Sequence, residues 1–187
     1  MGSGGSTKAE MDTRQTGREL SRIVYSREEI QDRVAVMAEE ITRAYGLDDD
    51  LLVLGLLKGS FIFLADLVRE IQHPLQVDFL VASSYRNEKK SRGTVNLLYD
   101  PEASVKDRSV ILVEDIIDSG TTINRLFPLL EGRGPRSLEV CALLHKRVAT
   151  LDREPRWVGF DAPMEFLVGY GLDYGEDFRH LPFIGSL

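Results

Sequence analysis

The stretch VILVEDIIDSGTT, residues 110–122, decides the fold and indicates the chemistry. It opens as the aliphatic run of a buried strand, then places Glu114 and Asp115 at the strand end and Asp118 shortly after. Carboxylates at the end of a buried strand are costly to desolvate without hydrogen-bond donors. Sugar hydroxyls or the water shell of a metal ion would supply such donors. An exposed strand end is the alternative, but it gives no reason for three acids.

The residues that follow, Ser119, Gly120, Thr121 and Thr122, fit two structures. Gly120 permits a tight turn, after which backbone N–H groups and three hydroxyls at a helix N-terminus would hold a monophosphate. The same residues are equally typical of a simple capped helix start. The neighbouring carboxylates favour the phosphate-binding interpretation. The segment is not a Walker A loop, because no Gly-Lys-Ser/Thr follows.

Outward from this stretch, apolar runs alternate with segments of helical period. Strands are predicted at residues 51–57, 77–85, 109–116 and 137–146, and helices at residues 27–45, 60–71 and 123–131. This alternation predicts an α/β fold in which helices flank a parallel sheet. Ligands bind at the carboxyl ends of the strands in such sheets. The polar clusters ED, LKGS and HK are expected to meet at that edge.

Length and composition bound the remaining possibilities. The chain has 187 residues and 43% hydrophobic residues, which predicts a single domain at residues 21–187. Residues 1–20 are Gly/Ser-rich and polar, and we expect a disordered tail there. A net charge of -7 argues against a general nucleic-acid or anionic-membrane binder. The single cysteine, Cys141, excludes an intrachain disulfide, and no long apolar segment is present, so a cytoplasmic protein is expected.

The opening motif resembles the phosphoribosyl-diphosphate (PRPP) signature of the type I phosphoribosyltransferases, in the version of the hypoxanthine-guanine branch. The resemblance extends from about Ser21 to Leu187 and includes LLKGSFIFLADLVREI, VDFLVASSY and FLVGYGLDYGEDFRHLPFIG in the order usual for that branch. It implies a small hood built from the N-terminal region and the C-terminal strands. It also implies transfer of the 5-phosphoribosyl group from PRPP to a 6-oxopurine, hypoxanthine and/or guanine. The products would be IMP or GMP and pyrophosphate, formed with Mg²⁺ through an oxocarbenium-like transition state.

The resemblance assigns roles to the three acids and to the loop that follows them. It implies that Asp118 faces the purine N7 and acts as general acid/base. Glu114 and Asp115 would accept hydrogen bonds from the ribose hydroxyls and favour positive charge developing on the sugar. The segment from Ser119 to Thr122 would hold the 5′-phosphate.

The leaving group is assigned to two other segments. The resemblance implies that Lys58 and Gly59 present backbone amides to the pyrophosphate, after a non-proline cis peptide. Without it, the simpler interpretation is a strand-to-helix turn with Gly59 at positive φ and Ser60 as N-cap. Asp173 is similar to an acidic ligand of Mg²⁺, and Arg179 is similar to an arginine that reaches the pyrophosphate.

Base recognition is assigned to the second half of the chain. Lys146 would bond the exocyclic O6 and reject adenine, although a lysine at a strand end is also a common surface feature. Phe166 would stack on the purine, and Leu167 would use its main chain on the base edge, although FLV also suits a hydrophobic core. Ser84 and Tyr85 would belong to a lid, within a charged segment that otherwise reads as a mobile hairpin loop.

Two alternatives remain open from the sequence. Proteins of this fold exist that bind nucleotides and regulate RNA without much catalysis, but Asp118, Lys146 and the acidic charge argue against that class here. The same fold also acts on xanthine or on pyrimidines. No residue named above discriminates among bases that differ at C2. The resemblance implies a homodimer or a homotetramer.

Overall fold

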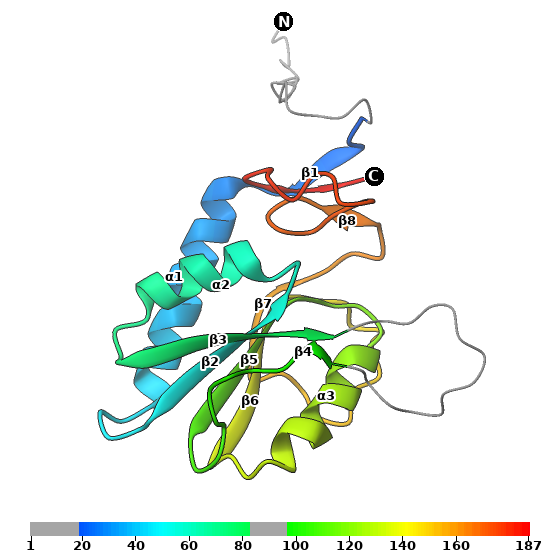
Figure 1. Ribbon diagram of the computed structural model, residues 1–187. Helices are drawn as coiled ribbons and strands as arrows, with labels where there is room; N and C mark the ends of the chain where they lie inside the picture. The colour runs from blue at the N-terminus through cyan, green and yellow to red at the C-terminus, as the bar shows by residue number, and fades with distance from the viewer. Residues whose placement is uncertain (1–18, 83–96) are drawn as a thin grey trace, which may run out of the picture.

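The structure is a computed structural model that describes residues 19–82 and 97–187, and its largest element is a six-stranded sheet (Figure 1). In spatial order the sheet contains β4 (Leu97–Tyr99), β3 (Leu75–Ala82), β2 (Leu51–Leu57), β5 (Ser109–Ile117), β6 (Ser137–His145) and β7 (Trp157–Asp161). Every neighbouring pair is parallel except β3 and β4. The predicted α/β fold with a parallel sheet is therefore confirmed.

Helices cover both faces of this sheet, as Figure 1 shows. On one face lie α1 (Arg27–Ala44) and α2 (Phe61–Glu70), and on the other lies α3 (Thr121–Glu131). In β5, Ile111 and Val113 join the core beneath α1 and α2, whereas the alternate residues Val110 and Leu112 pack towards α3. Burial on both faces explains why the central strands read as unbroken apolar runs. Within the two described ranges, no helix combines the length and hydropathy needed to cross a bilayer.

Helix α1 follows the predicted helical period and begins with a capping box. The Ser26 hydroxyl accepts a hydrogen bond from the Glu29 amide (3.2 Å), and the Glu29 carboxylate accepts one from the Ser26 amide (2.8 Å). The periodic apolar positions of this helix are buried, among them Ile30, Val34 and Met37. Burial of one apolar stripe holds α1 against the sheet.

A second, three-stranded sheet forms the hood. Its strands, in the order β1 (Arg22–Tyr25), β9 (Ile184–Ser186) and β8 (Leu167–Val168), are antiparallel. This sheet stands apart from the six-stranded sheet at the top of Figure 1. The N-terminal segment and the C-terminal strands thus build the hood together, as the resemblance implied. Of the predicted strand 77–85, β3 accounts for residues up to Ala82, and residues 83–85 lie outside the described ranges.

One side chain of α1 ties down β7, the strand at one edge of the large sheet. The Arg33 guanidinium donates to the carbonyl oxygens of Val158 (2.6 Å) and Gly159 (2.9 Å), and to the carboxylate of Glu40 (3.3 Å). Edge strands carry backbone groups that the sheet itself does not pair, and such groups need other partners. Arg33 therefore covers the edge that β7 would otherwise leave open.

We expect Arg33→Met to lower the free energy of unfolding by about 2 kcal/mol, because two half-buried carbonyl groups lose a charged donor. Urea denaturation of both proteins measures this difference. The matched control is Arg43→Met on the same helix, where an exposed ion pair with Glu39 is lost and less than about 1 kcal/mol is expected. Equal losses in the two variants would contradict a role for Arg33 at the sheet edge.

Candidate active site

A cavity of about 320 Å³ lies where β2, β3 and β5 end and α3 begins. From β3 the lining contains Ala82, and from the other segments it contains Lys58, Gly59, Glu114, Asp115, Ser119, Thr121, Thr122 and Arg125. A smaller hollow of about 60 Å³ adjoins the loop before α3 and is lined by Asp118 and Gly120 as well. The carboxyl edge of the sheet therefore gathers the predicted residues of the acidic motif and of the Lys58 loop.

The turn after β2 is not the simple strand-to-helix turn that its residues suggest. The Leu57–Lys58 peptide is cis, as the resemblance implied, and Gly59 does not have a positive φ. Gly59 is needed for another reason: a Cβ there would lie 1.7 Å from Oδ2 of Asp115. Ser60 occupies the N-cap position of α2, but its hydroxyl donates to the Leu56 carbonyl (2.7 Å) instead of capping the helix.

Glu114 and Asp115 are buried carboxylates, as predicted. Burial and the neighbouring Asp115 raise the pKa of Glu114 well above its ordinary value, and its Oε2 has no hydrogen-bond partner among the described residues. Burial raises the pKa of Asp115 to about 6, although the amides of Ile116 and of Asp115 itself oppose this shift. An unpaired buried acceptor is costly, so this end of β5 suits a ligand that brings hydrogen-bond donors or a cation.

The loop before α3 has the shape of an anion cradle rather than a conventional cap. Gly120 is the N-cap residue, with φ of 82°, and a Cβ there would lie 2.4 Å from the Thr150 carbonyl oxygen. The Ser119 hydroxyl accepts from the Thr121 amide (3.3 Å) and donates to the Thr121 hydroxyl (2.9 Å). Asp118 does not cap the helix. The first turn of α3 therefore turns its amide end and two threonines towards the cavities.

Asp118 and Lys146 form an ion pair, with 2.9 Å between Oδ1 and Nζ. The Lys146 side chain is 11% exposed and the Asp118 side chain is 68% exposed. The backbone brings them together, because the Lys146 amide donates to the Ile117 carbonyl (2.9 Å) where β5 and β6 end. Lys146 is thus not a freely solvated surface lysine.

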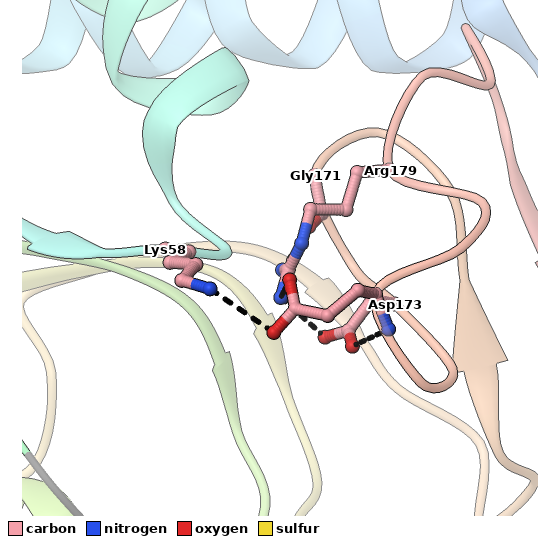
Figure 2. A network of polar contacts seen from close by, with 5 residues as sticks. Lys58, Gly171, Asp173 and Arg179 are labelled. Atoms are coloured by element: carbon pink, nitrogen blue, oxygen red, sulfur yellow. Dashed lines mark hydrogen bonds and ion pairs between the residues drawn. The ribbon is translucent and has the colours of Figure 1, made fainter.

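Charged residues of the loop between β8 and β9 meet the Lys58 loop, as Figure 2 shows. Arg179 lies 2.9 Å from Asp173 and 3.2 Å from Glu176, and it donates to the Gly171 carbonyl (2.8 Å). The second oxygen of Glu176 accepts from Lys58 Nζ (3.1 Å). Two of the three residues predicted for the leaving group, Lys58 and Arg179, are therefore brought together through Glu176.

Phe166 and Leu167 lie in the hood at the start of β8. The Phe166 ring is 53% exposed and meets the Tyr174 ring edge-on, with 5.4 Å between centroids. The Leu167 side chain is buried, and its backbone pairs with Ser186 of β9. Among the described residues, β8 is an edge strand of the hood and pairs with β9 alone. The predicted lid residues, Ser84 and Tyr85, lie outside the described residues.

Three residues that the sequence analysis did not select belong to these clusters. Arg125 lines the main cavity from the first turns of α3, four residues after Thr121, a spacing that places both on one helix face. Glu176 and Tyr174 both lie in the loop after β8. Glu176 pairs with Arg179, and the Tyr174 ring meets the Phe166 ring. Helical spacing would have indicated Arg125. Local spacing would not have indicated the contact of Glu176 with Lys58.

The donor set fits a magnesium ion that is held mainly by substrate and water. The described residues contain no cluster of three metal-ligating side chains. Magnesium usually binds one or two carboxylates together with phosphate oxygens and water. Asp173 supplies a carboxylate, and the unpaired Oε2 of Glu114 supplies another hard oxygen. These residues suit that pattern rather than a cage made only of protein ligands.

Comparisons with known proteins agree with this arrangement. Residues 24–175 match the family described as phosphoribosyl transferase domain. The hypoxanthine-guanine phosphoribosyltransferase of Dictyostelium discoideum is 39% identical over 169 residues, which cover 88% of this chain and 94% of the relative. The hypoxanthine phosphoribosyltransferase of Escherichia coli strain K12 is 42% identical over 161 residues, which cover 85% and 90%. The crystal structure of a hypoxanthine-guanine phosphoribosyltransferase from Bacillus anthracis, 40% identical, superposes with a TM-score of 0.84 over 90% of this chain and 99% of that one.

We expect Asp115→Asn to raise the free energy of unfolding at pH 7.5 by about 2 kcal/mol, because it removes a charge whose burial is unfavourable. A carboxyl whose pKa rises from 3.8 to about 6 on folding stabilises the fold in its protonated form, and this stabilisation is lost as the pH rises through 6. The advantage of the variant should therefore shrink between pH 6 and 4. Urea denaturation at several pH values tests this, with the exposed Asp32→Asn as control. A pH-independent difference would contradict it.

Proposed function

The chain belongs to the hypoxanthine(-guanine) branch of the type I phosphoribosyltransferases and is a purine-salvage enzyme, and from this premise we propose how its residues carry out the reaction. The family generally uses magnesium-bound PRPP and a purine base. We propose a 6-oxopurine as the base, hypoxanthine or guanine, and a single catalytic domain at residues 21–187. The observation that carries this proposal is the contact of 2.9 Å between Lys146 and Asp118.

Lys146 and Asp118 suit one edge of a 6-oxopurine. O6 and N7 lie side by side on that edge, and both are acceptors once N7 has lost its proton. The Lys146 ammonium donates to O6, while the Asp118 carboxylate receives the proton from N7 as N9 attacks C1 of the ribose. Adenine presents an amino group in place of O6, which leaves two donors facing each other.

The ribose and its 5′-phosphate occupy the main cavity. Ser119, Gly120, Thr121 and Thr122 hold the phosphate through backbone amides and hydroxyls at the start of α3. Glu114 and Asp115 accept from the ribose hydroxyls, which supplies a donor to Oε2 of Glu114, an oxygen without a partner among the described residues. Their negative charge favours the oxocarbenium-like sugar as the C1–oxygen bond to pyrophosphate breaks and the bond to N9 forms.

The leaving pyrophosphate faces the Lys58 loop and the loop after β8. Amides of Lys58 and Gly59 and the guanidinium of Arg179 bind its oxygens. Asp173 would hold a magnesium ion that arrives with PRPP, and the ion would supply positive charge to neutralise the pyrophosphate. Phe166 stacks on the purine, and the Leu167 main chain reads its edge from the outer strand of the hood. Ser84 and Tyr85 are assigned to a lid that excludes water from the reactive sugar.

An ultraviolet assay with PRPP and magnesium tests this mechanism, with hypoxanthine, guanine, xanthine and adenine offered separately. We expect turnover of 6-oxopurines but not of adenine. Asp118→Asn should lower kcat by about 100-fold or more, because the carboxylate no longer takes the N7 proton. The control is Asp32→Asn, on the exposed face of α1. Full activity of Asp118→Asn would reject the proton-transfer role, and turnover of adenine would reject the filter assigned to Lys146.

We also propose that the chain self-associates through the side of β3 next to α2. Phe79 and Val77 on this strand are 37% and 40% exposed, and Phe61 at the start of α2 is 43% exposed. Phe79 lies beside Leu64 of α2, one helical turn after Phe61. Large apolar side chains gathered on an open sheet face are typical of an interface between subunits.

Sedimentation velocity tests this interface. We expect a dimer or a tetramer for the natural chain and a smaller species for Phe79→Glu, because a buried charge without a partner is unfavourable at an interface. Leu47→Glu is the control, since Leu47 is 85% exposed and belongs to the loop after α1 and not to β3 or α2. A monomer already in the natural chain would contradict the proposal.

A further inference from the structure

One carboxylate connects the two sides of the leaving-group site. Oε1 of Glu176 accepts from Lys58 Nζ (3.1 Å), and Oε2 accepts from Arg179 (3.2 Å). Lys58 belongs to the turn after β2, and Arg179 belongs to the loop between β8 and β9 (Figure 2). Among the described residues, Glu176 is therefore the anion shared by two cations from separate segments.

The backbone holds Glu176 in this position. Its φ is 73° and that of Gly175 is 63°, so the chain turns sharply here. The Glu176 amide donates to Oδ2 of Asp173 (2.9 Å). On the other side, a Cβ at Gly171 would lie 2.0 Å from the Gly59 carbonyl oxygen, so this loop packs directly on the Lys58 turn. These contacts fix the Glu176 side chain opposite Lys58.

The contacts of Glu176 are suited to exchange. The Glu176 and Lys58 side chains are each 65% exposed, and such ion pairs are weak. The Arg179 side chain is 19% exposed, so losing every charged partner would be unfavourable for it. A diphosphate group carries more charge and more oxygens than one carboxylate, and can therefore replace Glu176 on both cations.

We propose that Glu176 is an internal substitute for the diphosphate group: its carboxylate occupies Lys58 and Arg179 in the free enzyme, and pyrophosphate or the diphosphate of PRPP displaces it. This inference deepens the proposed function and rests on it, because it assumes that Arg179 contacts the leaving group; it adds that the Lys58 ammonium does so as well as the Lys58 amide. Glu176 thus positions the two cations but also competes with substrate and product. If Glu176 mainly positions the two cations, removing its charge weakens pyrophosphate binding. If it mainly competes with pyrophosphate, removing its charge strengthens that binding. The sign of the change in pyrophosphate affinity therefore distinguishes the two roles.

The test is calorimetric titration of the full chain with magnesium pyrophosphate. We expect Glu176→Gln to bind pyrophosphate about 3- to 10-fold more tightly, because the two ion pairs made by this exposed carboxylate no longer have to be broken. Glu131→Gln is the matched control, because Glu131 is also exposed and paired, with Arg153, but lies in the last turn of α3. Unchanged or weaker binding by Glu176→Gln would overturn the inference and would indicate that Glu176 only supports the loop.

A second variant separates this inference from its premise. Arg179→Gln should weaken pyrophosphate binding by about 10-fold or more if the guanidinium contacts the leaving group. If Arg179→Gln weakens binding while Glu176→Gln does not tighten it, the substitute role fails and the proposed site stands. If Arg179→Gln has no effect, the assignment of Arg179 to the leaving group fails, and the inference fails with it. Tighter binding in the double variant than in Arg179→Gln alone supports competition between Glu176 and pyrophosphate for Lys58.

Discussion

The rest of the site depends on the burial of two adjacent carboxylates at the end of β5. A central strand covered on both faces brings Glu114 and Asp115 into an environment that disfavours their charged forms, which raises both pKa values. The neighbouring turn has to be built around them, and Gly59 is the residue that leaves room for Asp115. In the proposed complex, sugar hydroxyls and a cation would offset the unfavourable burial, so the feature that lowers the stability of the fold would also favour binding. In the proposed function, the two buried carboxylates thus lower the stability of the fold and increase its affinity for ligand.

Elsewhere the ligand-free site neutralises its own charges. Lys146 pairs with Asp118 on the side assigned to the base, and Arg179 pairs with Asp173 on the side assigned to the leaving group. Each pair consists of groups that have separate partners in the proposed complex. Such pairs keep flexible side chains near the positions where substrates will need them, which reduces the ordering required on binding. They also require that substrates break existing contacts, so affinity reflects a difference between two sets of ion pairs.

Much of this could be predicted from the sequence, and the exceptions have physical causes. Strands β2 and β5 and helix α1 are long and strongly patterned, and the acids and the cradle lie in one contiguous stretch, so local patterns suffice. Strands β4, β7, β8 and β9 are short, and their pairing is decided by distant segments. At the turn before α2, the residues alone favour positive φ at Gly59, whereas the glycine is needed for close contact with Asp115; the cis peptide there was implied by the resemblance and not by the local pattern. Glu176 meets Lys58 only after the whole chain has folded.

The pairing of β1 with β9 has a consequence for synthesis on the ribosome. Residues 22–25 emerge early, but their partners at residues 184–186 are made only after the entire large sheet. During translation the parallel sheet and its cradle can assemble first, because their contacts involve residues already made. The hood closes last, and with it come Phe166, Asp173 and Arg179. A nascent chain can therefore form the loop before α3 well before it forms the hood, so the proposed active site is complete only after the final strand has paired.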